Sequence, residues 1–209
     1  MGELEMPVYD CIGNHDHLGV YTSSGIAPDH PLYGDAYFTD WMDLEHPYYS
    51  FDYENWHFVL LNSIRITENR TYTGHFDDEQ LSWLQSDLEQ AGPEKQIVLA
   101  THIPLYSAAT FFRQNSLAAN TPGLVTDNSH RVMEICSPYQ LKAVLQGHLH
   151  IVEDIGWKET RFITGGAVSA GWWNGPYYGF EEGFVVVDVT GDNFSWTYET
   201  YGWDAAAAR

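Results

Sequence analysis

Short apolar runs recur along the chain, and most of them are rich in valine, isoleucine and aromatic residues. Alternation of apolar and polar positions with a period of two is typical of half-buried strands, and clusters of Gly, Pro, Asn and Asp between the runs favour turns. The strands predicted in this way cover residues 7–12, 49–53, 56–62, 96–101, 142–146, 161–164 and 183–189, with one more near 194–201.

Residues 77–91 have the spacing of a helix, because leucines recur there at three- and four-residue intervals. Asp77 is suited to cap the first turn, and the Gly-Pro pair after residue 91 ends the pattern. A second, shorter helix is expected over about residues 129–136. Early strand–helix alternation followed by late strands favours an α/β, layered α+β fold, and 209 residues fit a single domain over residues 1–209.

Two long segments show neither period. Residues 17–48 are rich in Gly, Pro and aromatic residues, and residues 107–128 carry Asn, Thr and Pro. Loops of this length inside a compact domain are usually functional or disordered.

The charge of the chain is strongly acidic, with 29 Asp and Glu against 9 Lys and Arg and a formal net charge of −20. This excludes the basic footprint of a nucleic-acid-binding protein, and an anionic substrate would need a bound metal to receive it. No apolar run reaches the length of a membrane span, and the first residues show no signal peptide, so the compartment stays open. Cys11 and Cys136 form no CxxC pair, and one disulfide between them is possible.

Three histidine motifs follow predicted strands directly: GNHDH at residues 13–17, THIP at residues 101–104 and GHLH at residues 147–150. Ligands bind at the carboxyl ends of strands in open α/β sheets, so the three loops are expected to bring their side chains together. On a strand, two histidines two positions apart would point to the same side. Imidazole and amide ligands suit divalent transition metals such as Mn, Zn, Fe or Ni. The other histidines are expected to be structural or exposed: His30, His46, His57, His75 and His130.

These motifs resemble those of a known protein family. GNHD, the histidine of THIP and GHLH, together with Gly165-Gly166-Ala167 and Gly171-Trp172-Trp173, resemble the calcineurin-like metallophosphoesterase superfamily, which includes purple acid phosphatases and cyclic-nucleotide phosphodiesterases. The resemblance implies a four-layer αββα sandwich and a hydrolytic site with two metal ions.

The same resemblance implies a role for each motif residue. Asn14, His102 and His148 would bind one metal ion, and His150 would bind the other. His15 would be catalytic, facing the phosphate and assisting the leaving oxygen. The substrate would be a small phosphate mono- or diester attacked by a metal-activated water.

In the superfamily two motifs precede GNHD: an Asp-x-His and, after it, a Gly-Asp-x-x-Asp. The second motif supplies an aspartate that bridges the two metal ions. Neither motif is found here. The Gly-Asp pairs at residues 34–35 and 191–192 do not follow buried strands and are not counted as replacements. The chain is therefore expected to be N-terminally shortened, without the first βαβα portion, and to cover the exposed surface by forming a homo-oligomer. Asp16 and His17 are possible substitute ligands.

Three functions stay open at this point. The first is a metal-dependent phosphoesterase with one or two ions, and the second is a non-catalytic relative that binds one metal ion or phosphate weakly. The third is a histidine-rich structural or metal-buffering protein. Tyr106, Trp172 and Trp173 are candidates for the wall of a substrate pocket, with ordinary packing as the alternative.

Overall fold

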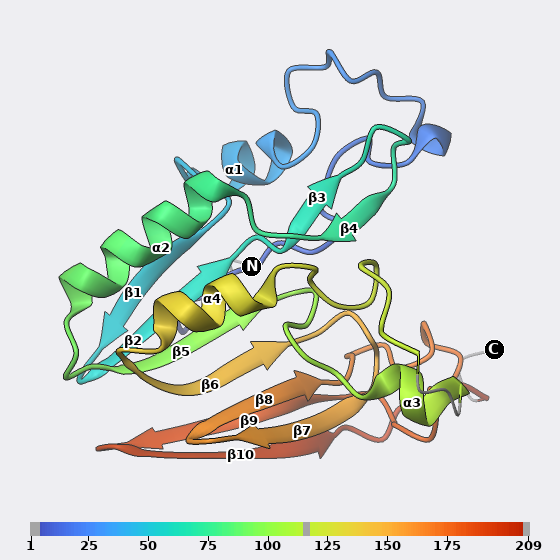
Figure 1. Ribbon diagram of the computed structural model, residues 1–209. Coiled ribbons are helices and arrows are strands. Elements are labelled where there is room, and N and C mark those ends of the chain that lie inside the picture. The colour runs from blue at the N-terminus through green and yellow to red at the C-terminus, as the bar shows by residue number, and fades with distance from the viewer. Residues whose placement is uncertain (1–4, 115–117, 207–209) are drawn as a thin grey trace.

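The computed structural model describes residues 5–114 and 118–206. Its centre is a mixed six-stranded sheet in the order β1-β2-β5-β6-β8-β7 (Figure 1). The four inner strands are parallel, whereas the edge strands β1 and β7 are antiparallel to their neighbours. The bounds are β1 Tyr49–Tyr53, β2 Trp56–Leu61, β5 Gln96–Thr101, β6 Gln140–Gln146, β7 Val152–Trp157 and β8 Thr160–Gly165.

Two helices, α2 (Asp78–Ala91) and α4 (Ser129–Cys136), lie side by side across one face of this sheet (Figure 1). Leu81, Leu84 and Leu88 of α2 are buried in the main core with strand residues. The Asp77 side chain caps α2 by accepting a hydrogen bond from the backbone N–H of Gln80. Both predicted helices are therefore confirmed, and the leucine spacing corresponds to the buried face.

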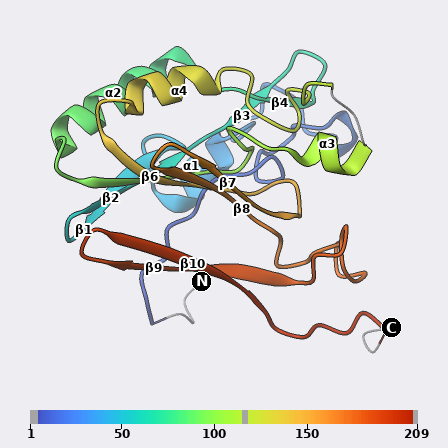
Figure 2. The same ribbon diagram turned by 60° about the horizontal axis from the view of Figure 1, so that its bottom comes forward.

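The other face of the sheet packs against a separate hairpin, β9 (Gly183–Thr190) and β10 (Asn193–Thr200), as Figure 2 shows. Val189 and Phe194 of the hairpin pack against a small buried cluster that includes Trp56. The indole N–H of Trp56 donates to the carbonyl of Gly191 at the hairpin turn, at 2.8 Å. This arrangement confirms the mixed α/β fold with a central sheet. The described residues form three layers, and none of their helices covers the outer side of β9–β10 as a fourth layer would.

Residues 7–12 are not a strand, contrary to the sequence prediction. The segment is attached mainly through side chains: the Tyr49 hydroxyl donates to the carbonyl of Asp10 at 3.1 Å, and the ring of Tyr9 stacks on that of Phe51. Ile12 is buried. Cys11 contacts the carbonyl of Leu61 at the end of β2. The segment cannot pair with β2 as a further strand, because β1 and β5 already flank β2 on its two sides. Val8 and Tyr9 of the segment are exposed, so Ile12 is its buried anchor.

Several elements were not predicted. The long segment 17–48 contains a 3₁₀ turn, η1 (Thr22–Ser24), and a helix, α1 (Ala36–Met42), and segment 107–128 contains α3 (Ala109–Gln114). Residues 115–117 of that segment lie outside the described part. The short hairpin β3 (Ile64–Ile66) and β4 (Tyr72–Gly74) was also missed, as was β7. Strands of three residues are too short to show a period, and the acidic β7 is an edge strand with mostly partial burial.

Two smaller expectations can also be compared with the structure. Cys11 and Cys136 are both free, so the possible disulfide between them is not formed. Among the helices of residues 5–114 and 118–206, none combines the length and the apolar composition needed to cross a membrane.

Candidate metal centre

The carboxyl ends of the parallel strands place two of the histidine motifs together. His102 follows β5 directly, and His148 lies two residues after β6. The Nε2 atom of His102 lies 2.8 Å from Oδ1 of Asn14 and 3.1 Å from Nδ1 of His148. Asn14 comes from the loop that follows residues 7–12 and is almost fully buried. Three side chains that are distant in sequence thus direct one donor atom each toward a common point.

A glycine makes the approach of the Asn14 loop possible. A Cβ atom on Gly13 would lie only 3.0 Å from Nδ1 of His102, which is closer than ordinary packing allows. The loops after β5 and β6 are joined directly, because the backbone N–H of Gly147 donates to the carbonyl of His102 at 3.0 Å. Backbone contacts therefore hold the loops that carry the three donors.

The two histidines of GHLH do not lie on a strand, contrary to the expectation. His148 and His150 both lie beyond β6 and have left-handed backbone conformations, with φ of 68° and 56°. The Nδ1–H of His150 donates to the carbonyl of Ala170 at 2.6 Å, and its ring lies 4.6 Å from that of Trp172. His150 thus has its own backbone and ring partners, while its charge still contributes to lowering the pKa of His102 and of His148.

Hydrogen bonding and burial prepare the imidazoles as ligands. The Nε2–H of His148 donates to the carbonyl of Gly123 at 2.9 Å, which leaves the Nδ1 lone pair directed toward His102. A backbone carbonyl that fixes the tautomer in this way is the usual outer partner of a ligating histidine. Burial, with a further contribution from the neighbouring histidines, lowers the pKa of His102 to about 3, and burial also lowers the pKa of His148. Both rings are therefore neutral, which is the form that binds metal ions.

The donor set fits one borderline divalent ion. Donor atoms 2.8 and 3.1 Å apart have the spacing of ligands that share an ion, roughly 3 Å. All three donors are neutral, and nowhere in the described residues do three or more His, Cys, Asp or Glu side chains form a metal-binding group. Two imidazoles and one amide oxygen still match the preferences of Mn, Zn, Fe or Ni.

The two possible substitute ligands are engaged elsewhere in this conformation. Asp16 accepts the backbone N–H of Gly13 at 2.8 Å. The Nδ1–H of His17 donates to the carbonyl of Gly13 at 2.9 Å. Both side chains close the turn of the GNHDH loop on itself, and neither has a contact with His102 or His148 within the described residues.

His15 lies at an opening of the surface rather than among the buried donors. Its side chain is exposed and lines a cavity of about 230 Å³ together with Tyr37 and Trp41 of α1. Its ring centre lies 6.1 Å from that of Tyr21, whose hydroxyl lies 3.4 Å from the amide nitrogen of Asn14. His15 is thus next to the donor group and accessible to a small molecule.

The three aromatic residues considered as pocket walls have different surroundings. Trp172 is largely exposed and packs on His150 and Tyr177. Trp173 instead packs edge-on against Trp203. Tyr106 packs edge-on against the core residue Phe162, and its backbone is bound by Gln146. Only Trp172 is in contact with a histidine of the three motifs.

Sequence reasoning missed the residues that support the site from the β3–β4 hairpin. Tyr72 of β4 places its ring edge-on to that of His148. Arg70, in the turn of the hairpin, donates to the carbonyls of Gly19 and Ile26 at 2.5 and 2.6 Å. The guanidinium thereby holds the loop that contains Tyr21, whose hydroxyl lies beside the amide of Asn14. The scarcity of basic residues was the one signal that could have drawn attention to Arg70.

Two comparisons with known proteins concern the family and the fold of the chain. A model of the calcineurin-like phosphoesterase family matches residues 1–152. Among solved structures, the chain is similar to a dimetal phosphatase from Danio rerio, with 14% identity and a TM-score of 0.55 over 87% of this chain and 68% of that chain. This similarity concerns the fold.

A weaker similarity connects the chain to GAP50, the anchor in the inner membrane complex of Plasmodium. It has 14% identity and a TM-score of 0.37 over 56% of this chain and 35% of that chain, too low to support an argument. A search of curated proteins found no match. Since the family model covers well over half of the sequence, the chain belongs to the calcineurin-like phosphoesterase family.

Proposed function

We propose that this protein hydrolyses small phosphate mono- or diesters with a divalent metal ion held by Asn14, His102 and His148. The observation that carries the proposal is the convergence of their donor atoms, at 2.8 and 3.1 Å, on the carboxyl edge of the parallel strands. Membership in the calcineurin-like phosphoesterase family supports metal-dependent hydrolysis of phosphate esters in general.

A bound cation would supply positive charge for phosphate oxygens and would make a water easier to deprotonate. The remaining work falls to the residues of the chain. His15, exposed beside the donor group, would give a proton to the leaving oxygen, and the neighbouring cavity offers room for the leaving group. His150 has Nε2 left for a second ion, because its Nδ1–H is bound to Ala170. Trp172, which packs on His150, would form one wall of the substrate site.

A second candidate is a non-catalytic relative that binds one metal ion or phosphate weakly. One observation favours it: in residues 5–114 and 118–206 no carboxylate joins the two imidazoles in a metal-binding group. A neutral donor set neutralises no charge on the cation, so its affinity is expected to be lower than that of a carboxylate-bridged centre.

Elemental analysis of metal content, combined with turnover assays, separates the two candidates. The assays use p-nitrophenyl phosphate and bis-p-nitrophenyl phosphate with added manganese, nickel or zinc. Bound metal with turnover that disappears in His102→Ala, but not in a His130→Ala control on the exposed side of α4, supports the enzyme. Bound metal without turnover of either ester supports the non-catalytic candidate, and turnover unaffected by His102→Ala overturns the site.

The expected homo-oligomer stays a prediction. Large aromatic side chains near the described N-terminal segment are exposed, among them Tyr9, Tyr37 and Trp41. Exposed apolar surface of this kind favours association with a second copy. Light scattering coupled to size exclusion tests it, and a monomer at all concentrations would contradict it.

A further inference from the structure

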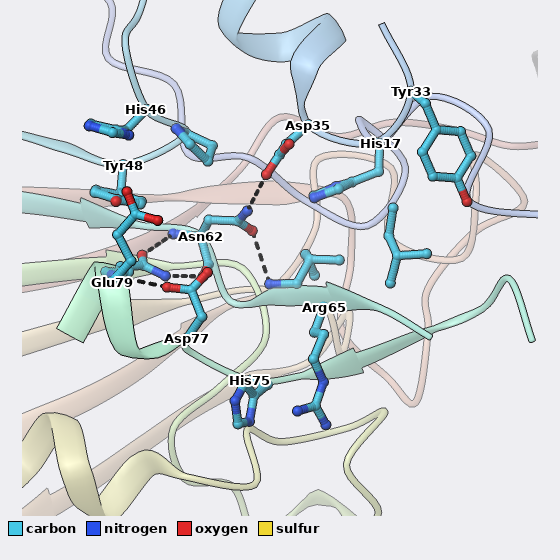
Figure 3. Close-up of a pocket in the computed structure, with 15 residues that line it drawn as sticks. His17, Tyr33, Asp35, His46, Tyr48, Asn62, Arg65, His75, Asp77 and Glu79 are labelled. Atoms are coloured by element: carbon cyan, nitrogen blue, oxygen red, sulfur yellow. Dashed lines mark hydrogen bonds between the residues drawn. The ribbon is translucent and has the colours of Figure 1, made fainter. Parts of the chain in front are cut away.

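A second cavity, of about 410 Å³, opens beside the GNHDH loop and does not include Asn14, His102 or His148. Its volume lies in the usual range of small-molecule sites, roughly 300–1,000 Å³. Figure 3 shows that its walls come from the loop that contains His17 and Asp35, from the β3–β4 hairpin and from the start of α2. The proposed phosphoesterase chemistry uses none of these side chains.

His17 lines this cavity and has a buried ring nitrogen without a partner among the described residues. Its side chain lines the cavity although the residue is only 4% exposed. Since the carbonyl of Gly13 can only accept, the proton of the neutral ring is on Nδ1, and Nε2 is left with a lone pair. This buried Nε2 has no hydrogen-bond partner among the residues that the structure describes. An unsatisfied buried acceptor favours a ligand that donates a hydrogen bond.

The cavity is negatively charged at two places. Asp35 lies near His17 and accepts a hydrogen bond from the amide of Asn62 at 3.3 Å, while Asp77 and Glu79 lie at the first turn of α2. Burial, together with the charges of Glu79, Asp77 and Asp35, raises the pKa of the cavity residue Tyr48 to about 12. An anion, including phosphate, is therefore disfavoured here.

The guanidinium at the rim does not cancel this charge. Arg65 and His75 line the cavity, but both bind Asp127, at 3.3 and 2.6 Å. Asn62 lies between Asp35 and the carboxylates at the start of α2 (Figure 3), and the rest of the wall includes the ring of Tyr33 and the side chains of Ile64 and Ile66. Carboxylates at two ends of a partly apolar cavity match a molecule with two ammonium groups joined by methylenes.

A bare metal ion fits less well than such a molecule. His17 and Asp35 have no third His, Cys, Asp or Glu arranged with them to hold an ion within the described part of the chain. The cavity volume of 410 Å³ is also far larger than one ion requires. We propose that this cavity binds a linear aliphatic di- or polyamine, with one ammonium group donating to His17 Nε2 and Asp35 and another held by Glu79.

Calorimetric titration of the full chain with spermidine and with putrescine tests the proposal, at about 0.15 M salt so that the general attraction of a −20 protein is screened. Saturable binding at one site per chain is expected. Asp35→Asn keeps the acceptor for Asn62 but removes the charge, and should weaken binding about tenfold. Glu79→Gln, at an exposed position, should weaken it about threefold.

Glu89→Gln is the matched control, because it removes the same charge from the exposed side of the same helix, away from the cavity. It should leave the affinity within about a factor of 1.5. Absence of saturable amine binding overturns the proposal. So does equal weakening by Asp35→Asn and Glu89→Gln, since that result means attraction to net charge alone. Saturation by manganese with no amine binding assigns the cavity to a metal ion and overturns it as well.

Discussion

The Nε2 atom of His57 on β2 lies 2.8 Å from Oδ2 of Asp87 on α2, so one side chain ties the sheet to the helix that covers it. The other ring nitrogen lies 2.7 Å from a carboxylate oxygen of Asp52 on β1. Burial by itself lowers the pKa of His57, but its hydrogen bonds with Asp87 and Asp52 outweigh burial and raise the pKa above the ordinary value.

This raised pKa predicts a stability that depends on pH. The protonated ring binds both carboxylates, so its contribution is fully present below the unfolded pKa of about 6.5 and is lost as pH rises through the folded pKa. His57→Leu should lower the free energy of unfolding by about 1–3 kcal/mol at about pH 5.5. The loss should be smaller at about pH 9. Urea unfolding at both pH values measures it, and an equal loss at both would contradict the role of the charged ring.

Gly13 and Gly147 provide a matched pair at the metal centre. A Cβ on Gly13 would lie 3.0 Å from Nδ1 of His102, whereas a Cβ on Gly147 would lie 3.7 Å from it, which is ordinary contact. Gly13→Ala should therefore displace the His102 ring and weaken metal binding about tenfold. Gly147→Ala should leave the affinity almost unchanged. Titration with manganese or zinc compares the two, and similar affinities for both variants would show that the ring does not need this space.

His15 and His148 are expected to differ in what their loss removes. His15 is exposed and outside the donor group, so His15→Ala should reduce turnover by about 100-fold while the metal content is kept. His148 directs its Nδ1 toward His102, so His148→Ala should reduce metal content and turnover together. Metal analysis and steady-state kinetics on the same preparations measure both. Loss of metal in His15→Ala would mean that His15 is a ligand.

Arg70 is expected to stabilise the loop of residues 19–26. Nη2 of its guanidinium donates to the carbonyls of both Gly19 and Ile26, and the ammonium nitrogen of a lysine, one bond closer to the backbone, would not reach the position of Nη2. Arg70→Lys should lower the free energy of unfolding by about 1–3 kcal/mol and make this loop more sensitive to limited proteolysis. Arg131→Lys, whose partner Asp78 is exposed, serves as the control with little change. A loop that stays as resistant as in the wild type would contradict the role of Arg70.

The sequence reveals features that depend on local spacing. The leucines of α2, its Asp77 cap and the inner strands β2, β5, β6 and β8 follow from patterns that neighbouring residues share. The histidines of THIP and GHLH could be placed after strands for the same reason, whereas the segment before GNHDH is not a strand. The segment 7–12 shows the limit, because an apolar run is consistent both with a strand and with a segment that only packs.

Features that depend on distant partners could not be predicted. The left-handed backbone takes His148 and His150 out of a strand conformation, and no spacing in GHLH indicates it. The contact of Arg70 with Gly19 spans 51 residues and depends on a hairpin too short to recognise. The free Nε2 of His17 likewise results from tertiary packing, since a buried histidine and an exposed one are identical in sequence.

The order of the donors along the chain has a consequence for synthesis. Asn14 and His102 are separated by 88 residues, and His102 and His148 by another 46. Asn14 is synthesised early, and its side chain has no neighbouring donors until two parallel strands, β5 and β6, have been made and paired. During translation the nascent polypeptide thus holds single, weak metal ligands rather than a centre. Metal binding would then be a late step of folding, and it would occur only after the parallel strands of the sheet have paired.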